Sequence, residues 1–201
     1  MSADLLLSTA YLPPSEYFER LLSSGEAFIE REENYIKQSY RNRCYILSSS
    51  GPQPLSVPVY LGSLHKTPVK DIRIDYTKRW QQVHLGAIRA AYSSSPYFLF
   101  YFEQIESVIL RNYEFLLDLN MELLSALLKM LKIECGVRYT SEYIKPGIAE
   151  NDFRYSVSPK KDTGYRPKAY QKVFECEGVN EGRLSIIDLL FSQGPDSARF
   201  L

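Results

Sequence analysis

The first thirty residues contain two short apolar runs with an amphipathic segment between them, and this pattern constrains the fold more than any other. The runs at 5–10 and 26–30 are typical of buried strands, while Pro14 favours the start of a helix between them. A strand, a helix and a strand in this order form a right-handed crossover with parallel strands. Ligands of such sheets bind at the carboxyl ends of the strands. We therefore expect ligand-binding residues near 11–13 and 30–33.

Three amphipathic segments between residues 77 and 131 predict a helical block, because apolar side chains recur in each at three- and four-residue spacing. Ahead of this block, the turn-rich stretch 48–54 joins two apolar runs and predicts a β-hairpin. The alternating residues 71–75 predict a strand, as do residues 133–139. With 201 residues, we expect a single α/β domain over residues 1–201, a mixed sheet that opens with a β-α-β unit, plus a three-helix block.

The last third of the chain contains a segment of a different kind. Residues 145–166 are rich in Pro, Gly, Asn, Asp and Lys, so we expect an irregular, mobile loop that can act as a lid. Ordered structure is expected to resume at 170–174. A helix is then predicted at 184–191, with Ser185 as its cap and Gly194 at its end.

Charge and cysteine content exclude several classes of protein. Lys plus Arg and Asp plus Glu number 24 each, so the net charge is zero and we expect no specific binding to duplex DNA. The three cysteines have no pairing at short spacing and are interpreted as reduced thiols of a cytoplasmic protein. The sequence has no metal-ligand spacing and no apolar run long enough for a transmembrane segment. It identifies neither a cofactor nor an oligomeric state.

A dense polar block at residues 30–43 lies between two apolar segments, which is unusual for a solvated loop. If the block is extended, strand alternation places four charged side chains on one face: Glu33, Lys37, Arg41 and Arg43. If it is helical, the first three stack at i, i+4 spacing and Arg43 leaves the group. In both conformations Lys37 and Arg41 converge and could bind a carboxylate or phosphate. The alternative is an ion-pair ladder that contributes little stability.

Two groups are candidates for acid–base chemistry. His84 lies four residues after Trp80 on the apolar face of a predicted helix, where an imidazole that titrates near neutrality could act as a general base. Glu33, with Glu30 and Glu32 nearby, could supply a carboxylate for the same role. The alternatives are a hydrogen-bonded core histidine and a solvated acidic turn.

Several separate pieces of the chain together match one family pattern. In chain order they are Tyr11-Leu12-Pro13 with Tyr17-Phe18, Asn34-x-x-Lys37-x-x-Tyr40-Arg41-Asn42-Arg43, Leu55-Ser56-Val57-Pro58-Val59, Trp80 with His84, Tyr92 with Pro96-Tyr97-Phe98, and L-S-I-I-D-L-L-F-x-x-G from Leu184 to Gly194. On these residues the chain resembles the WbqC-like family of bacterial proteins. The resemblance implies a role in the biosynthesis of cell-surface polysaccharides, the setting in which the family was named.

The leading hypothesis is a cytoplasmic transferase that acts on a nucleotide-activated sugar or a similar small anionic metabolite. It rests on the resemblance and on the basic residues of the polar block. No hydrolase, P-loop or Rossmann motif occurs, and transferases often lack a short motif. The predicted roles are ligand binding by Tyr11, Asn34, Lys37, Arg41, Asn42 and Arg43, and acid–base catalysis by His84 and Glu33. The alternative is a non-catalytic binding or assembly protein of an envelope pathway.

Overall fold

Strand β1 (Leu5–Ser8) opens the chain, and all four of its residues are buried. Helix α1 (Ser15–Leu22) follows after an extended Pro14, and buries Tyr17, Phe18 and Leu21. Strand β2 (Glu26–Glu30) then pairs with β1 in parallel, with Leu5 opposite Ala27. The computed structural model describes residues 5–60 and 67–201, and it confirms the predicted β-α-β opening.

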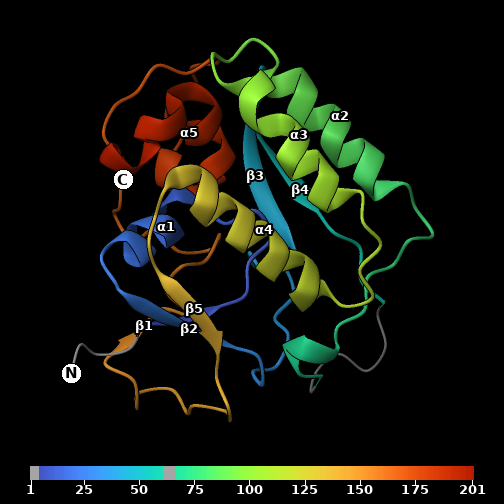
Figure 1. The fold of residues 1–201 in the computed structure, drawn as a ribbon, viewed down its shortest axis with the longest axis vertical. Coiled ribbons are helices and arrows are strands. Elements are labelled where there is room, and N and C mark those ends of the chain that lie inside the picture. Colours follow the sequence, from blue (N-terminus) through green and yellow to red (C-terminus); the bar gives the residue numbers. More distant parts are fainter. Residues whose placement is uncertain (1–4, 61–66) are drawn as a thin grey trace.

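Four parallel strands form the main sheet, in the order β5-β2-β1-β6 (Figure 1). Strand β5 (Gly136–Tyr139) pairs with β2, and the short β6 (Asn151–Asp152) pairs with the other side of β1. Because all four strands run in the same direction, their carboxyl ends meet at one edge of the sheet. The last residues of the strands there are Ser8, Glu30, Tyr139 and Asp152.

A separate two-stranded antiparallel sheet is formed by β3 (Arg43–Ser48) and β4 (Gly51–Ser56). The hairpin was predicted, but its second strand begins earlier than expected, because Gly51 with φ +100° closes a tight turn directly after Ser48. Pro52 and Pro54 therefore lie within β4, opposite Leu47 and Tyr45. The Leu47 N–H points away from β4 and donates to the Tyr92 hydroxyl at 3.0 Å, as in a non-hydrogen-bonded pair of an antiparallel ladder, so the missing N–H of Pro52 removes no bond between β3 and β4.

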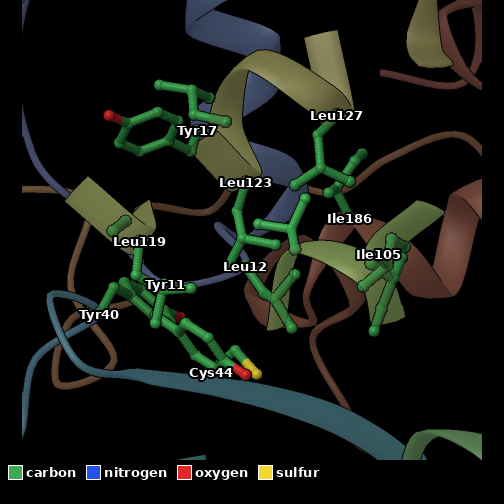
Figure 2. Packing of buried hydrophobic residues seen from close by; sticks show 14 of the residues in the cluster. Tyr11, Leu12, Tyr17, Tyr40, Cys44, Ile105, Leu119, Leu123, Leu127 and Ile186 are labelled. Carbon is green, nitrogen blue, oxygen red and sulfur yellow. The ribbon is translucent and has the colours of Figure 1, made fainter. Parts of the chain in front are cut away.

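The predicted helical block is present as α2 (Trp80–Tyr92), α3 (Phe98–Ile109) and α4 (Leu116–Leu131). Helix α2 packs on β3, and α3 packs on α4. Figure 2 shows Leu119, Leu123 and Leu127 of α4 directed into the core that also holds Leu12 and Ile186. In the described ranges, no helix is both long and apolar enough to cross a bilayer.

Helix α4 ends in a Schellman motif. Lys132 adopts a left-handed conformation with φ 55°, and the Ile133 N–H donates to the Leu128 carbonyl at 3.0 Å. Ile133, at the position where this motif usually has an apolar residue, is buried. A non-glycine residue at the left-handed position is unfavourable by itself, so the surrounding bonds hold it there.

The predicted C-terminal helix is α5 (Ile186–Gln193), followed by a 3₁₀ helix, η4 (Gly194–Arg199). Ser185 occupies the N-cap position but makes no capping bond with its side chain. Asp188 is buried in the first turn, and it accepts hydrogen bonds from the hydroxyls of Tyr92 (2.9 Å) and Tyr170 (2.6 Å). Burial raises the pKa of Asp188, and the two hydroxyls oppose that effect. The carboxylate thus joins α5 to α2 and to the chain near Tyr170.

Besides the start of β4, three predicted features differ in the structure. The stretch 71–75 is not a strand: it begins with the last residue of the 3₁₀ helix η2 (Val69–Asp71). Arg73 and Ile74 form only isolated bridges, because no strand among the described residues runs beside them. No strand or helix forms at 170–174. The segment 145–166 is not wholly irregular, because it contains β6 and the fully buried Arg154.

Candidate functional site

The carboxyl edge of the parallel sheet is occupied by polar groups of the chain itself. Glu30, the last residue of β2, is fully buried, and one oxygen of its carboxylate accepts from the Thr140 hydroxyl at 2.8 Å. The other oxygen accepts from the Ile144 N–H at 2.8 Å. The space in which many parallel sheets bind a ligand is therefore partly closed by Glu30 and the chain that follows β5.

Arg154 crosses the same edge with a fully buried side chain. Its guanidinium donates to Asp152 through Nε (2.9 Å) and Nη2 (2.6 Å). Its Nη1 donates to the Ile144 carbonyl at 2.8 Å and lies 3.3 Å from Glu30 Oε2. Two carboxylates and a carbonyl thus fix the orientation of this cation.

Glu33 and Arg41 form a second buried ion pair. Arg41 donates from Nε to Oε1 of Glu33 at 2.8 Å and from Nη2 to Oε2 at 2.7 Å. Arg41 is only 3% exposed and Glu33 only 1%. The loop between β2 and β3 is neither strand nor helix, so neither predicted conformation of the polar block is correct. Asn120 anchors the loop by donating from Nδ2 to the Arg41 carbonyl at 2.8 Å. Burial raises the pKa of Glu33, and the guanidinium of Arg41 opposes that effect.

A hollow of about 60 Å³ lies beside both guanidinium groups, and we call it the Arg41 hollow. Its polar lining consists of Gln38, Ser39, Arg41, Arg154, Tyr155, Ser158 and Lys160. Glu33 engages Nε and Nη2 of Arg41, whereas Nη1 has no hydrogen-bond acceptor among the described residues. Nη1 is therefore the donor that Arg41 can offer to a ligand here.

The structure does not bring the other predicted cations to this hollow. Lys37 and Asn34 are exposed, and neither lines it. Arg43 belongs to β3 and donates from Nε to the Ser56 hydroxyl at 2.8 Å. Asn42 donates from Nδ2 to the Val57 carbonyl at 2.9 Å. Of the four charged residues predicted to share one face (Glu33, Lys37, Arg41 and Arg43), only Glu33 and Arg41 form an ion pair with each other in the described structure.

Tyr11 and His84 form a separate buried pair. The Tyr11 hydroxyl lies 2.9 Å from Nδ1 of His84, and both side chains are at most 3% exposed. Burial lowers the pKa of His84 to about 4, and a hydrogen bond with the Ser56 backbone opposes this. His84 borders a shallow hollow of about 320 Å³ that Trp80 and Ser56 also line. This placement is that of a hydrogen-bonded core histidine, and its catalytic role stays a prediction.

A larger cavity of about 500 Å³, which no sequence pattern indicated, lies between the β3–β4 hairpin and the chain from 162 to 184, and we call it the hairpin cavity. Its lining includes Tyr45, Asp162, Arg166, Cys176, Asn180 and Arg183. One wall comes from the chain between 162 and 184, which has little regular structure, and the other from the distant hairpin, so no local pattern revealed the cavity. One signal was present, because Arg183 directly precedes the L-S-I-I run used for the family resemblance.

Comparison with known proteins supplies the family. Residues 9–163 match the model of the WbqC-like protein family. The chain belongs to the WbqC-like family. It is also 24% identical over 222 residues to the uncharacterized protein Rv1507c of Mycobacterium tuberculosis, a match that covers 98% of this chain and 96% of that protein. No solved structure matches the chain significantly.

The matched range has a defined relation to the two cavities of this WbqC-like protein. Arg41, Arg154 and Lys160 all lie within residues 9–163, so the cations of the Arg41 hollow belong to the region that defines the family. Arg166 and Arg183 of the hairpin cavity lie after it. Among the residues that the structure describes, no group of three His, Cys, Asp or Glu side chains is arranged to hold a metal ion.

Proposed function

We propose that this WbqC-like protein is a transferase of bacterial cell-surface polysaccharide biosynthesis that acts on a nucleotide-activated sugar or a similar anionic metabolite. The observation that carries the proposal is the orientation of Arg41 at the carboxyl edge of the parallel sheet. Glu33 holds one side of its guanidinium, and Nη1 has no acceptor among the described residues. A cation fixed in advance loses little freedom when it binds an anion, which favours affinity.

The charges around the Arg41 hollow support an anionic ligand. Three carboxylates balance the network behind the hollow and already accept hydrogen bonds: Glu30, Glu33 and Asp152. Lys160 is exposed at the hollow and forms no ion pair with a described residue. A phosphate or carboxylate group would therefore meet Lys160 and Nη1 of Arg41 together.

The size of the hollow limits what it can hold. A volume of about 60 Å³ accommodates one small anionic group, whereas pockets for whole metabolites occupy roughly 300–1,000 Å³. The rest of the metabolite would lie outside, over the exposed part of the polar block. Asn34 and Lys37 remain candidates for contacts there. In this proposal Glu33 is a positioning residue, because both of its oxygens accept from Arg41.

The test is calorimetric titration with inorganic phosphate and a panel of nucleotide sugars. Arg41→Lys keeps the charge but cannot bind both oxygens of Glu33 and still present a fixed third donor to the ligand, so we expect the affinity to fall about tenfold to a hundredfold. Arg43→Lys is the matched control, because Arg43 does not line the hollow and should tolerate the change. Circular dichroism confirms that each variant is folded. No binding of any ligand, or equal affinities of the two variants, would contradict the proposal.

Exposed apolar side chains favour a second candidate, the non-catalytic assembly protein. Leu99 and Phe100 lie next to each other in α3 and are 85% and 71% exposed, which is typical of side chains that a partner covers. Replacing both by Ser should then abolish function in a complementation assay without changing metabolite affinity. If the double variant complements fully, this candidate is wrong.

A further inference from the structure

The hairpin cavity has the dimensions of a metabolite site. At about 500 Å³ it is the size of pockets that enclose small ligands, roughly 300–1,000 Å³. Its wall combines apolar side chains from both sides of the cavity, Tyr45 and Pro52 from the hairpin and Val179 and Leu184 from the chain opposite. The rest of the wall is polar, and such groups fix the orientation of a ligand in a pocket.

Two of the charged groups in the lining neutralise each other. Arg166 donates two hydrogen bonds to Asp162, each 3.1 Å long. Asp162 also accepts from the Gly164 N–H at 2.9 Å and from Asn180 Nδ2 at 3.0 Å. With four donors around it, the Asp162 carboxylate is fully engaged. Glu177 also lines the cavity but is exposed to solvent, which screens its charge.

Arg183 differs from Arg166 because it forms no direct ion pair: the Asp162 carboxylate, which Arg166 already engages, interacts with the Arg183 guanidinium only at longer range. No carboxylate of the described residues lies within ion-pair distance of its guanidinium, which is partly buried. Its neighbour is Tyr40, whose hydroxyl donates to the Arg183 backbone carbonyl at 3.3 Å. Burial raises the pKa of Tyr40. The Arg183 guanidinium lowers this pKa by less, so the hydroxyl carries no charge. The cavity therefore contains one cation that retains its capacity to bind an anion.

Tyr45 supplies the second element of recognition. Its ring is partly buried and rests edge-on against Tyr40, with the ring centres 6.4 Å apart. Pro52 of the adjacent strand lines the cavity beside it. A tyrosine ring fixed in this way offers an amphipathic surface against which the ring of a ligand can pack.

We propose that the hairpin cavity is a second ligand site, which takes a ring compound of monosaccharide to nucleoside size that carries a phosphate group. Arg183 binds the phosphate, and the ring of the ligand lies against Tyr45 and Pro52. The proposal does not rest on the transferase function, because neither Arg41 nor Glu33 lines this cavity. A sugar phosphate and a nucleoside monophosphate share this chemistry, and the experiment below distinguishes them.

The cysteines of the chain provide a direct measure of occupancy. Cys176 lines the cavity and is partly exposed, so a bound ligand should shield its thiol from alkylation. Cys135 is also partly exposed but does not line the cavity, and it serves as the internal reference. Cys44 is buried, so its thiol should not react with iodoacetamide whether or not a ligand is bound. Peptide mass spectrometry after iodoacetamide treatment reports each thiol separately.

The probes are inorganic phosphate, glucose, glucose 1-phosphate and uridine monophosphate. A probe that binds, supplied at a concentration about ten times its dissociation constant, should slow alkylation of Cys176 about tenfold by mass action. Alkylation of Cys135 should not change. We expect this from at least one of the two ring phosphates, and the one that protects identifies the ligand class. Neither inorganic phosphate nor glucose should protect at the same concentration. Absence of protection by both ring phosphates would overturn the proposal, as would equal protection by inorganic phosphate.

Variants test the role of Arg183. Arg183→Gln should lower the affinity for the protecting probe about tenfold to a hundredfold, because a charge-assisted contact is lost. Arg183→Lys keeps the charge and should recover part of the affinity, which separates binding from a folding defect. Arg138→Gln is the matched control, since Arg138 is an exposed strand residue paired with Glu26. Unchanged protection in Arg183→Gln would overturn the proposal, whereas Arg41→Lys should leave protection intact.

Discussion

Glu33 binds Arg41 through two parallel hydrogen bonds, and almost no solvent reaches either side chain. We predict that Glu33→Met or Arg41→Met destabilises the fold by about 3–5 kcal/mol, because each substitution leaves one buried charge without its partner. The double variant should lose much less than the sum of the two. Urea denaturation of the three variants measures the coupling.

A surface pair provides the control for this cycle. Arg73 and Glu114 are 3.2 Å apart and about 60% exposed, so the same substitutions there should change stability by less than about 1 kcal/mol. If the Glu33 and Arg41 variants behave like this pair, the buried ion pair does not stabilise the fold.

The burial of His84 predicts acid sensitivity. The pKa of its imidazole falls from 6.5 to about 4 on folding, so between these values the unfolded chain binds a proton that the folded chain does not. The free energy of unfolding should therefore decrease as the pH falls from 6.5 to 4, by up to about 3 kcal/mol from this residue. Urea midpoints measured across this range for wild type and His84→Gln isolate the effect. Parallel curves would show that His84 contributes nothing.

The Schellman motif at the end of α4 predicts a stabilising substitution. Lys132→Gly should raise stability by up to about 1 kcal/mol, because glycine adopts the left-handed conformation without the cost that a side chain incurs. Lys129→Gly, at an exposed position within the last helical turn, should lower it by about 1 kcal/mol. Thermal melts of both variants decide this, and a loss of stability in Lys132→Gly would refute the argument.

Hydrogen exchange should divide the segment 145–166 into two parts. The Phe153 N–H donates to the Leu6 carbonyl at 2.9 Å and should exchange slowly, as part of the sheet. Residues 145–150 and 158–166 on either side of this bond bury little, so we expect their amides to exchange fastest within the segment. Helix α4 is the slow reference. Uniform protection from 145 to 166 would contradict both the original expectation of a mobile loop and this narrower one.

The elements with regular apolar spacing were predicted well, because their burial follows one face of a strand or helix. Strand β2 has the predicted bounds, and the three helices from α2 to α4 lie where the periodicity put them. The alternating stretch 71–75 shows the limit of this approach. Ile72 and Ile74 are buried as the pattern requires, but a strand also needs a partner beside it, and sequence spacing does not report that.

The candidate site was predicted less well, because long-range contacts decide it. The polar block was correctly placed at the carboxyl end of β2, and Arg41 does lie near that edge. Its conformation follows from a turn in which Gln38 has φ 56°, and no strand or helix pattern describes such a turn. Arg154 reaches Glu30 across 124 positions of sequence, a pairing that charge patterning within the block could not anticipate.

The two prolines of β4 have a consequence for association between molecules. Pro52 and Pro54 lack the N–H groups through which a neighbouring strand would be bound. The residues opposite them on β3 bond to other parts of the chain: the Leu47 N–H donates to the Tyr92 hydroxyl, and the Tyr45 carbonyl accepts from the Ser185 N–H. The open edge of the hairpin therefore presents carbonyls without alternating donors. It cannot template a third strand from another copy, which protects this sheet against edge-to-edge aggregation.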